Sequence, residues 1–380
     1  MVCMVGVITL WTLYTWVFEE LRNILFMKAN LIRFISFILI FILIFLCLQE
    51  IYLPYSNVSN LIAQFYNEPV NSIDVLMFGT SSVRAAVHPP VLWDEAGIAS
   101  FNFAAPRLNP AISYFLLRET LDYQSPSVVI LGGQYLFSES VDFHRHESGF
   151  RRGLDRMRLS RNKLAAINKI VSNDERQTRL SYLLPLLRYH DRKDLSKSDF
   201  DFAFLWERSL WMSALNPSMD RSAPVVRPEF TASAGDISGY YVQRKIELLK
   251  ERNIDVVLIF PPVCHANYWS EERHNTLQNF ADSMGVLLID FNTEELYNYI
   301  NLDESIDFYN KGHVNLSGGT KTARYIAQYL SQTFNLPDRR DGQFDPHWDL
   351  VLEVYHTRYR NLLEKIAEGQ FDEVENEEEM

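Results

Sequence analysis

The chain has 380 residues, of which 47% are hydrophobic and 22% charged, and its formal net charge is −12. This length and composition are typical of one or two globular domains with a substantial core, and they exclude a disordered chain. The acidic balance argues against a general nucleic-acid binder, which normally carries a basic surface.

The first predicted element is a transmembrane helix. Residues 34–48 read FISFILIFILIFLCL, and Ser36 is the only polar residue among them. Residues 31–33 bring the stretch close to the ~20 residues that a spanning helix needs. A cleaved signal peptide is the alternative, but no A-x-A-like cleavage site follows. We therefore predict that residues 1–53 form a membrane anchor.

Two basic residues at the start of the span predict its orientation. Lys28 and Arg33 place the N-terminal side in the cytoplasm, so the chain after Tyr52 is expected to be extracytoplasmic on the inner (cytoplasmic) membrane. Residues 1–18 form another apolar stretch. Either it is a second span in a two-pass hairpin, or Met27 is the true start of the chain. Both alternatives leave the main domain outside the cytoplasm.

Short apolar runs alternate with helix-like segments in the rest of the chain. The runs are mostly unbroken, as expected for parallel strands covered on both faces. The five predicted strands are 74–79, 99–104, 127–132, 255–260 and 285–291. The four predicted helices are 111–123, 239–252, 270–284 and 317–333. This alternation predicts an α/β fold with a parallel sheet.

Two segments do not fit the alternation within the predicted α/β domain, residues 54–335. Residues 138–237 form a helical insertion between the third and fourth strands. Within 151–200 there are thirteen Lys or Arg against six Asp or Glu. This excess is either a solvated helical face or a patch that meets an anionic polymer or lipid head groups. Residues 336–380 are expected to form a helix over 347–367 and an acidic, disordered tail.

Polar residues follow the predicted strands, and ligands bind at the carboxyl ends of strands in open parallel sheets. Ser81 follows the first strand, Gln134 the third, and His313 lies after the fifth. A serine hydroxyl needs a base within hydrogen-bonding reach to act as a nucleophile. A neutral histidine can take that proton and return it. The alternatives are a helix N-cap for Ser81 and a loop position for His313.

At these residues the chain resembles the SGNH/GDSL hydrolase superfamily. The likeness is closest to its membrane-anchored branch, which includes the lipoteichoic-acid D-alanylation protein D and polysaccharide O-acetyltransferases. The turn Gly79-Thr80-Ser81 matches the first block, and His88-Pro89 matches the His-Pro pair of that branch. Residues 310–315 (NKGHVN) match the last block except at their first position. The resemblance covers roughly residues 72–335 without the insertion, and it implies a flavodoxin-like three-layer fold.

The resemblance implies that Ser81 is the nucleophile and His313 the general base. A third group usually holds the imidazole in the correct tautomer. The family has Asp where this chain has Asn310, and Asp307, six residues before the histidine, is the alternative orienting group. We keep both as candidates.

For the oxyanion hole, the resemblance implies a Gly in the second block and an Asn in the third. The third-block match places Gly133 and Gln134 there, and a Gln side chain can donate a hydrogen bond as Asn does. In the second block Arg107 stands where the Gly is expected. It either binds an anionic group of the substrate or faces solvent. His88 is expected to order the turn before Pro89.

The predicted function is that of an acyltransferase or esterase acting on O-acyl groups of a cell-envelope polysaccharide or teichoic-acid-like polymer. The resemblance implies a membrane-bound O-acyltransferase as partner. The alternative is a non-catalytic scaffold in envelope polysaccharide biosynthesis. No cofactor is expected, because neither a P-loop nor a dinucleotide fingerprint is present. No metal is expected, because the remaining histidines lack a ligand spacing, and Cys264 reads as a buried thiol without a disulfide partner.

Overall fold

The computed structural model describes residues 2–54, 57–106, 108–137, 147–171, 179–210, 235–264, 269–341 and 345–368. The chain forms two compact units. The larger comprises Tyr55–Leu183 and Asp201–Met380, and the smaller comprises Met1–Pro54 and Leu184–Phe200.

A five-stranded parallel sheet forms the centre of the larger unit, and its strand order is β2-β1-β3-β4-β5. The strands are β1 (Val75–Phe78), β2 (Ser100–Asn102), β3 (Val128–Gly132), β4 (Asp255–Phe260) and β5 (Leu287–Asp290). Their ends lie within two residues of the predicted runs. This order is the flavodoxin-like doubly wound arrangement. The predicted fold class is therefore confirmed.

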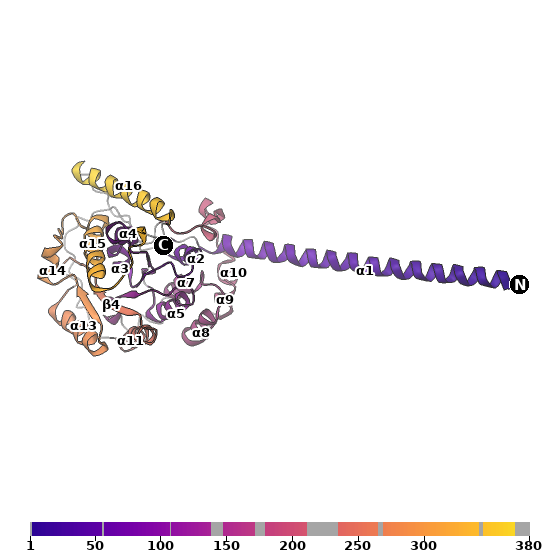
Figure 1. Cartoon of the computed structure of the whole chain (residues 1–380), viewed down its shortest axis with the longest axis horizontal. Coiled ribbons are helices and arrows are strands. Elements are labelled where there is room, and N and C mark those ends of the chain that lie inside the picture. Colours follow the sequence, from indigo (N-terminus) through magenta and orange to yellow (C-terminus); the bar gives the residue numbers. More distant parts are fainter. Residues whose placement is uncertain are drawn as a thin grey trace. The chain divides into compact units, whose positions relative to one another are not determined.

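Helices cover both faces of this sheet, as the unbroken apolar runs predict. Side chains alternate between the faces along each strand, so Val75 and Met77 pack in one core cluster and Leu76 and Phe78 in another. The first face is covered by α3 (Ser81–Ala86), α4 (Pro89–Ala96) and α15 (Leu316–Thr333). The second is covered by α2 (Asn57–Phe65), α5 (Pro110–Thr120), α11 (Asp236–Glu251) and α13 (Glu271–Met284). Figure 1 shows α3, α4 and α15 above β4 and α11 and α13 below it.

The four predicted helices of the α/β domain are confirmed as α5, α11, α13 and α15. A small element was not predicted: an antiparallel pair of short strands, β6 (Phe308–Asn310) and β7 (His313–Val314), lies directly before α15. The helix α14 (Glu294–Tyr299) connects β5 to this pair. The pair contains Asn310 and His313 of the predicted last block.

The described part of the insertion is helical, as predicted. It follows the 3₁₀ helix η1 (Gly133–Phe137), and in the larger unit it contains α7 (Glu147–Leu154), α8 (Arg161–Ile170), α9 (Arg179–Leu183) and the 3₁₀ helix η3 (Ala203–Leu205). Phe150 and Ile167 pack against Phe115 of α5. Part of the predicted basic excess is internal, because Arg151 and Lys163 are each 5% exposed, and Arg151 pairs with neighbouring carboxylates.

The C-terminal helix α16 (His347–Glu368) confirms the predicted helix at 347–367. The Trp348 ring stacks on Trp93 of α4 with a centroid distance of 4.6 Å, and Val351 and Tyr355 are buried. Before it, the 3₁₀ helix η4 (Arg339–Asp341) is fixed by a bidentate bond from Arg339 to the Asp74 carboxylate. The predicted disordered tail, 369–380, lies outside the described residues.

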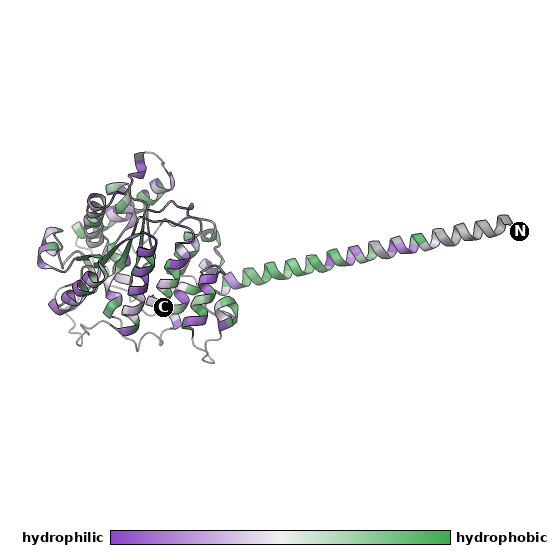
Figure 2. Cartoon of the chain, turned by 60° about the horizontal axis from the view of Figure 1, so that its bottom comes forward, coloured by the Kyte–Doolittle hydropathy of each residue, from purple (hydrophilic) through white to green (hydrophobic). Residues whose placement is uncertain are grey.

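The smaller unit contains one long helix, α1 (Val2–Tyr52), with the short α10 (Leu186–Tyr189) and the 3₁₀ helix η2 (Lys197–Phe200). Within α1, Phe26–Tyr52 is long and apolar enough to cross a membrane, and Figure 2 shows its hydrophobic residues in green. Its length and composition fit a membrane anchor and a signal sequence alike. Because α1 is continuous, the two apolar stretches are not separated by the turn that the two-pass alternative requires.

Candidate active site

The predicted nucleophile and base are in contact. Ser81 Oγ and His313 Nε2 are 2.6 Å apart, although 232 positions separate the residues in sequence. Ser81 is the first residue of α3, and Thr80 occupies the N-cap position, so Ser81 does not serve merely as the cap. Both side chains are partly exposed and therefore accessible to a ligand.

Asn310 holds the other side of the histidine ring. Its Oδ1 lies 2.8 Å from His313 Nδ1 and also accepts a hydrogen bond from the Gly312 backbone N–H at 3.0 Å. The N–H of Gly312 identifies this atom of the amide as the oxygen, which can only accept. His313 Nδ1 therefore carries the hydrogen, and Nε2 is left as the acceptor that faces Ser81.

Asp307, the alternative orienting group, binds residues of the loop before β6 and of α15. It is fully buried, and its oxygens accept hydrogen bonds from Ser317 Oγ at 2.7 Å and from the Asp303 backbone N–H at 2.8 Å. Lys321 Nζ of α15 lies 2.6 Å from its Oδ2. These bonds fix the loop before β6 to the first turns of α15. The Asp307 carboxylate is thus occupied by Ser317, Asp303 and Lys321, whereas Asn310 contacts the imidazole, so the geometry favours Asn310 as the candidate orienting group.

The loop that carries the histidine is held by three kinds of contact. The ring of Tyr309 stacks on the His313 ring, with centroids 5.3 Å apart and planes 17° from parallel. The loop after β4 reaches across, because the Cys264 backbone N–H donates to the Lys311 carbonyl at 2.9 Å. Asn315 caps α15 by accepting from the N–H groups of the next turn. The histidine is therefore held between a strand pair and a helix start.

Close packing of α15 on α3 brings this loop to Ser81. A Cβ atom on Gly319 would overlap the Ala85 carbonyl oxygen and the His88 ring, so only glycine permits this approach. His88 is fully buried, and its Nε2 lies 2.8 Å from the Ala85 carbonyl. Burial lowers the pKa of His88 to about 4, and the hydrogen bond to Ala85 opposes that shift. His88 therefore orders the turn before Pro89, as predicted.

The turn before Ser81 is fixed from the neighbouring strands. The Gly79 carbonyl accepts hydrogen bonds from the Ala105 N–H at 3.2 Å and from the Tyr135 hydroxyl at 2.9 Å. Asn102, at the end of β2, donates to the Val87 carbonyl at 2.8 Å. Because β1 and β3 are paired in register, Gly79 lies directly beside Gly132. The turn is therefore bound on both sides.

Gln134 lies beside this turn with an amide that has no partner. A Cβ atom on Gly132 would be 3.3 Å from Gln134 Oε1 and 3.1 Å from Gly79 Cα, which places the amide next to the nucleophile turn. Both polar atoms of the amide are buried without a hydrogen-bond partner among the described residues. Buried polar groups are normally paired, and an unpaired one calls for an explanation. An oxyanion that forms on a substrate at Ser81 would supply the missing acceptor.

The other two residues predicted to bind the substrate are Gly133 and Arg107. Gly133 is buried, and a Cβ atom there would collide with Leu277 of α13 and approach the Ile259 carbonyl, so its smallness serves packing. Arg107 lies outside the described residues. The sequence also did not indicate the parts played by Tyr309 and Tyr135. An aromatic residue before the histidine block was the only available signal for Tyr309.

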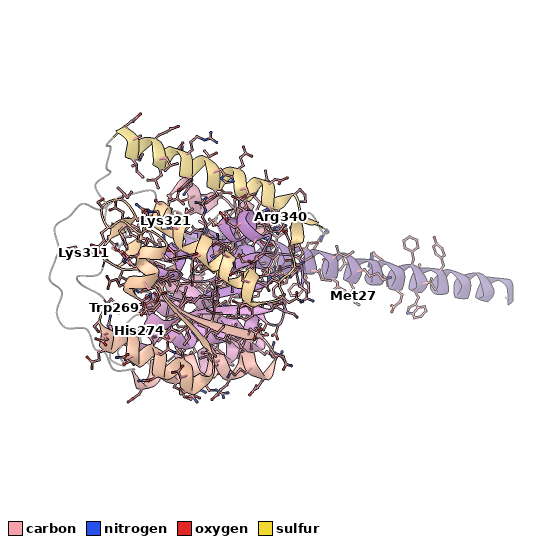
Figure 3. The ribbon with its side chains drawn as sticks, turned by 60° about the vertical axis from the view of Figure 1, so that its left-hand side comes forward. Met27, Trp269, His274, Lys311, Lys321 and Arg340 are labelled. Atoms are coloured by element: carbon pink, nitrogen blue, oxygen red, sulfur yellow. The ribbon has the colours of Figure 1, made fainter. Side chains whose placement is uncertain are left out.

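A second group of polar residues lies at the carboxyl ends of β4 and β5. Asp290 Oδ2 accepts hydrogen bonds from His274 Nδ1 at 2.8 Å and from Trp269 Nε1 at 3.1 Å. Its Oδ1 accepts from the backbone and side chain of Asn292, which in turn binds the loop after β4. Figure 3 shows Trp269 and His274 next to each other. These bonds link the loops on this side of the site.

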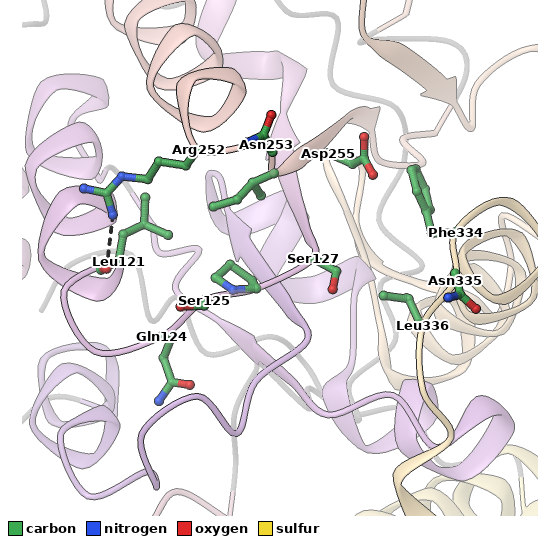
Figure 4. A pocket seen from close by; sticks show the side chains of 12 residues that line it. Leu121, Gln124, Ser125, Ser127, Arg252, Asn253, Asp255, Phe334, Asn335 and Leu336 are labelled. Carbon is green, nitrogen blue, oxygen red and sulfur yellow. Dashed lines mark hydrogen bonds between the residues drawn. The ribbon is translucent and has the colours of Figure 1, made fainter.

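A surface cavity of about 490 Å³ lies elsewhere, as Figure 4 shows. Its lining includes Ser127, which precedes β3, and Asp255, which begins β4, so it faces the amino ends of the strands. Ser81 follows the carboxyl end of β1. The cavity is therefore at the opposite edge of the sheet from the Ser81–His313 pair. Over the described ranges, no group of three or more His, Cys, Asp or Glu side chains could hold a metal ion.

The chain matches no protein-family model and no curated protein. Solved structures similar to it include a putative lipolytic protein of the G-D-S-L family from Desulfitobacterium hafniense, with 10% identity over 68% of this chain and 99% of that chain and a TM-score of 0.32. A catalytic mutant of an acetylxylan esterase from Geobacillus stearothermophilus has 11% identity over 70% and 96% of the chains and a TM-score of 0.34. A lipase/acylhydrolase from Enterococcus faecalis has 12% identity over 70% and 98% and a TM-score of 0.33. At these values, the chemistry proposed below rests on the distances within this chain.

Proposed function

We propose that the protein is a serine-dependent acyl esterase or acyltransferase that forms an acyl-enzyme on Ser81. The observation that carries this proposal is the continuous contact from Ser81 Oγ to His313 Nε2 at 2.6 Å and from His313 Nδ1 to Asn310 Oδ1 at 2.8 Å. A nucleophile, a base and an orienting acceptor in that order are the requirements of acyl transfer through a serine.

The reaction follows from these contacts. Ser81 Oγ attacks the acyl carbonyl while His313 Nε2 takes the hydroxyl proton, and the carbonyl oxygen becomes an oxyanion. The tetrahedral intermediate collapses, the bond to the leaving alcohol breaks, and His313 gives the proton to that alcohol. An acceptor hydroxyl or water then attacks the acyl-enzyme and passes its proton to His313, which returns it to Ser81. Water gives hydrolysis, and a sugar hydroxyl gives transfer.

Two donors would stabilise the oxyanion. The Ser81 backbone N–H is at the first position of α3, where the helix itself offers no acceptor. The Gln134 amide is the second donor, and it has no hydrogen-bond partner among the residues that the structure describes, which keeps it available. Donors aimed at a developing charge in a water-poor site are a large source of rate enhancement.

The proposed substrate is an O-acylated polymer of the cell envelope, such as a polysaccharide or a teichoic-acid-like chain. The proposed partner of this protein is a membrane-bound O-acyltransferase. Support comes from the apolar span Phe26–Tyr52 and from the His-Pro and histidine blocks that resemble the membrane-anchored branch. Lys28 and Arg33 favour an extracytoplasmic catalytic unit. The assignment to that branch, the orientation and the partner are parts of the proposal.

Labelling with a fluorophosphonate probe tests the catalytic part directly. The full-length protein in detergent should react with the probe, and peptide mapping should place the adduct on Ser81. The variant Ser81→Ala should not be labelled, whereas Ser82→Ala, which alters the adjacent hydroxyl, should still react. Absence of labelling in correctly folded wild-type protein contradicts the proposal.

A second candidate is a scaffold protein of envelope polysaccharide biosynthesis that keeps the fold without catalysis. Asn310 favours it, because the residue that orients His313 carries no charge to stabilise an imidazolium. Complementation in cells distinguishes the two functions. A Ser81→Ala variant that restores full envelope modification supports the scaffold, and one that restores none supports the enzyme.

A further inference from the structure

Lys245 is a buried lysine that the proposed chemistry does not use. It lies on α11 and is fully buried, and its Nζ donates to Ser113 Oγ of α5 at 3.0 Å. The same Nζ sits over the ring of Tyr135 at 4.2 Å from its centroid. Burial lowers the pKa of Lys245, and no carboxylate among the described residues pairs with it. The lysine is therefore held by a hydroxyl and an aromatic face rather than by an ion pair.

These contacts lead to the nucleophile turn. Ser113, whose Oγ accepts from Lys245, also lies near the Tyr135 hydroxyl, where it opposes the rise in the Tyr135 pKa that burial causes. The Tyr135 hydroxyl in turn donates to the Gly79 carbonyl at 2.9 Å. Ser113 and Tyr135 are 0% and 1% exposed, so solvent does not compete for these bonds. Lys245 therefore contacts both Ser113 and the Tyr135 ring, and Tyr135 binds Gly79, which lies two residues before Ser81.

We propose that Lys245 is a positioning residue for the nucleophile, acting through Ser113 and Tyr135 on the Gly79 carbonyl. The inference rests on the proposed function of Ser81. Lys245 does not touch the substrate. The ammonium binds Ser113 and attracts the face of the Tyr135 ring, so the Tyr135 hydroxyl holds the Gly79 carbonyl in the orientation that presents Ser81 to His313. Coupled hydrogen bonds in a low-dielectric interior strengthen one another.

Packing alone is a poor reason for a lysine at this position. Burial lowers the pKa of Lys245 to about 7. Its folded-state pKa is thus below the unfolded value, so the lysine destabilises the fold at neutral and lower pH, and this effect fades as pH rises toward the unfolded value. A methionine has similar length and no charge. A side chain kept at a cost in stability is typical of functional positions.

Among the residues that the structure places, the groups that face Lys245 are neutral. Ser113 faces it from α5 and Tyr135 from η1, and burial raises the pKa of Tyr135 well above its usual range. Tyr241, one turn earlier on α11, packs against Tyr114 of α5, and burial raises its pKa also. Between pH 6 and 8 the lysine is therefore the group in this cluster whose charge changes.

The test compares Lys245→Met with a matched variant of another buried lysine. Lys163 is 5% exposed and donates to the Met157 carbonyl in the insertion, and burial lowers its pKa to about 8. At pH 6, Lys245→Met should reduce the rate constant of fluorophosphonate labelling by about tenfold, the scale of a slightly misplaced nucleophile, while raising Tm. Lys163→Met should leave the labelling rate unchanged. A loss of rate combined with a higher Tm is not the signature of a damaged fold.

The pH dependence of the labelling rate and a variant of Tyr135 extend this test. The ratio of wild-type to Lys245→Met rates should shrink as pH rises through about 7, because the wild-type lysine then also loses its charge. Tyr135→Phe should slow labelling to a similar extent, and the double variant Lys245→Met/Tyr135→Phe should be no slower than either single variant. Equal labelling rates for Lys245→Met and wild type at pH 6 overturn the inference, and so do fully additive effects.

A measurement that needs no activity separates this inference from the proposed function. Hydrogen exchange of the backbone amides in residues 79–84 should be faster in Lys245→Met than in wild type, and unchanged in Lys163→Met. If wild-type protein does not react with the probe, the proposed function fails, and exchange alone decides the inference. Identical exchange in this turn for all three proteins overturns it.

Discussion

His313 Nδ1 and Asn310 Oδ1 lie 2.8 Å apart, and this contact sets the state of the proposed base. The amide oxygen keeps the hydrogen on Nδ1 and leaves Nε2 free to accept from Ser81. The amide oxygen keeps this orientation because the Gly312 N–H also binds it. It lacks the negative charge that would stabilise the imidazolium formed when His313 takes the serine proton. The site therefore has the geometry of an acyl-transfer triad without its charged member.

Replacing Asn310 with Asp should accelerate the reaction. A carboxylate can accept from both His313 Nδ1 and the Gly312 N–H, so the two existing bonds are retained. We expect kcat for a chromogenic acetate ester to rise by about 10- to 10³-fold, within the effect of this exchange in a serine triad. The nearby charge also favours protonated histidine, so the acidic limb of the pH–rate profile should move to higher pH. Asn310→Ala should lower kcat. An unchanged rate in both variants contradicts the orienting role.

Asp307→Asn should lower stability and leave the chemistry largely intact. The buried carboxylate binds Ser317, Asp303 and Lys321, and the substitution leaves the lysine without its ionic partner. Loss of one member of a buried pair costs about 3 kcal/mol, which urea unfolding would measure as a lower transition midpoint. In folded protein at low temperature, kcat should stay within about threefold of wild type, a difference below 1 kcal/mol. A large loss of kcat with unchanged stability would return the orienting role to Asp307.

Gln134→Leu should slow acylation without destabilising the protein. The amide has no partner within the described part of the chain, so its removal deletes no hydrogen bond seen there. We expect the free energy of unfolding to stay the same or increase, because a buried unpaired polar group is removed. The loss of an oxyanion donor should reduce kcat by about 10²- to 10³-fold with little change in KM. Gln134→Glu, which replaces the donor with an acceptor, should be at least as slow. Normal kcat in Gln134→Leu rules out the donor role.

His88 should make the fold sensitive to acid. Its pKa is lowered to about 4 by burial, so the unfolded chain takes up the proton first as pH falls. Stability is unaffected above the ordinary histidine pKa of about 6.5, falls as pH decreases below it, and levels off below the folded pKa. The full effect is about 3 kcal/mol. His88→Gln retains a donor for the Ala85 carbonyl and should flatten this pH dependence in urea unfolding between pH 7 and 4.5. Identical slopes for the two proteins contradict the assignment.

The strands and the Ser81–His313 pair could be predicted because they depend on local pattern and order along the chain. Unbroken apolar runs placed the strands, and polar residues at their ends converged at one edge of a parallel sheet. The choice between Asn310 and Asp307 required the fold. Lys321, which binds the Asp307 carboxylate, is fourteen positions away on another element. Lys245 stands on a helix with polar neighbours, and its burial is created by α5 and η1. Tertiary contacts of this kind leave no periodic signal.

The central claim is that Ser81 carries the acyl group in a covalent intermediate. The most direct measurement is an acid quench of the full-length protein during turnover of a chromogenic acetate ester, followed by peptide mass mapping. The account predicts an acetyl group on the peptide that contains Ser81 and its absence in Ser81→Ala. Ester cleavage with no adduct on Ser81, or with the acetyl group on another side chain that remains in Ser81→Ala, would contradict it.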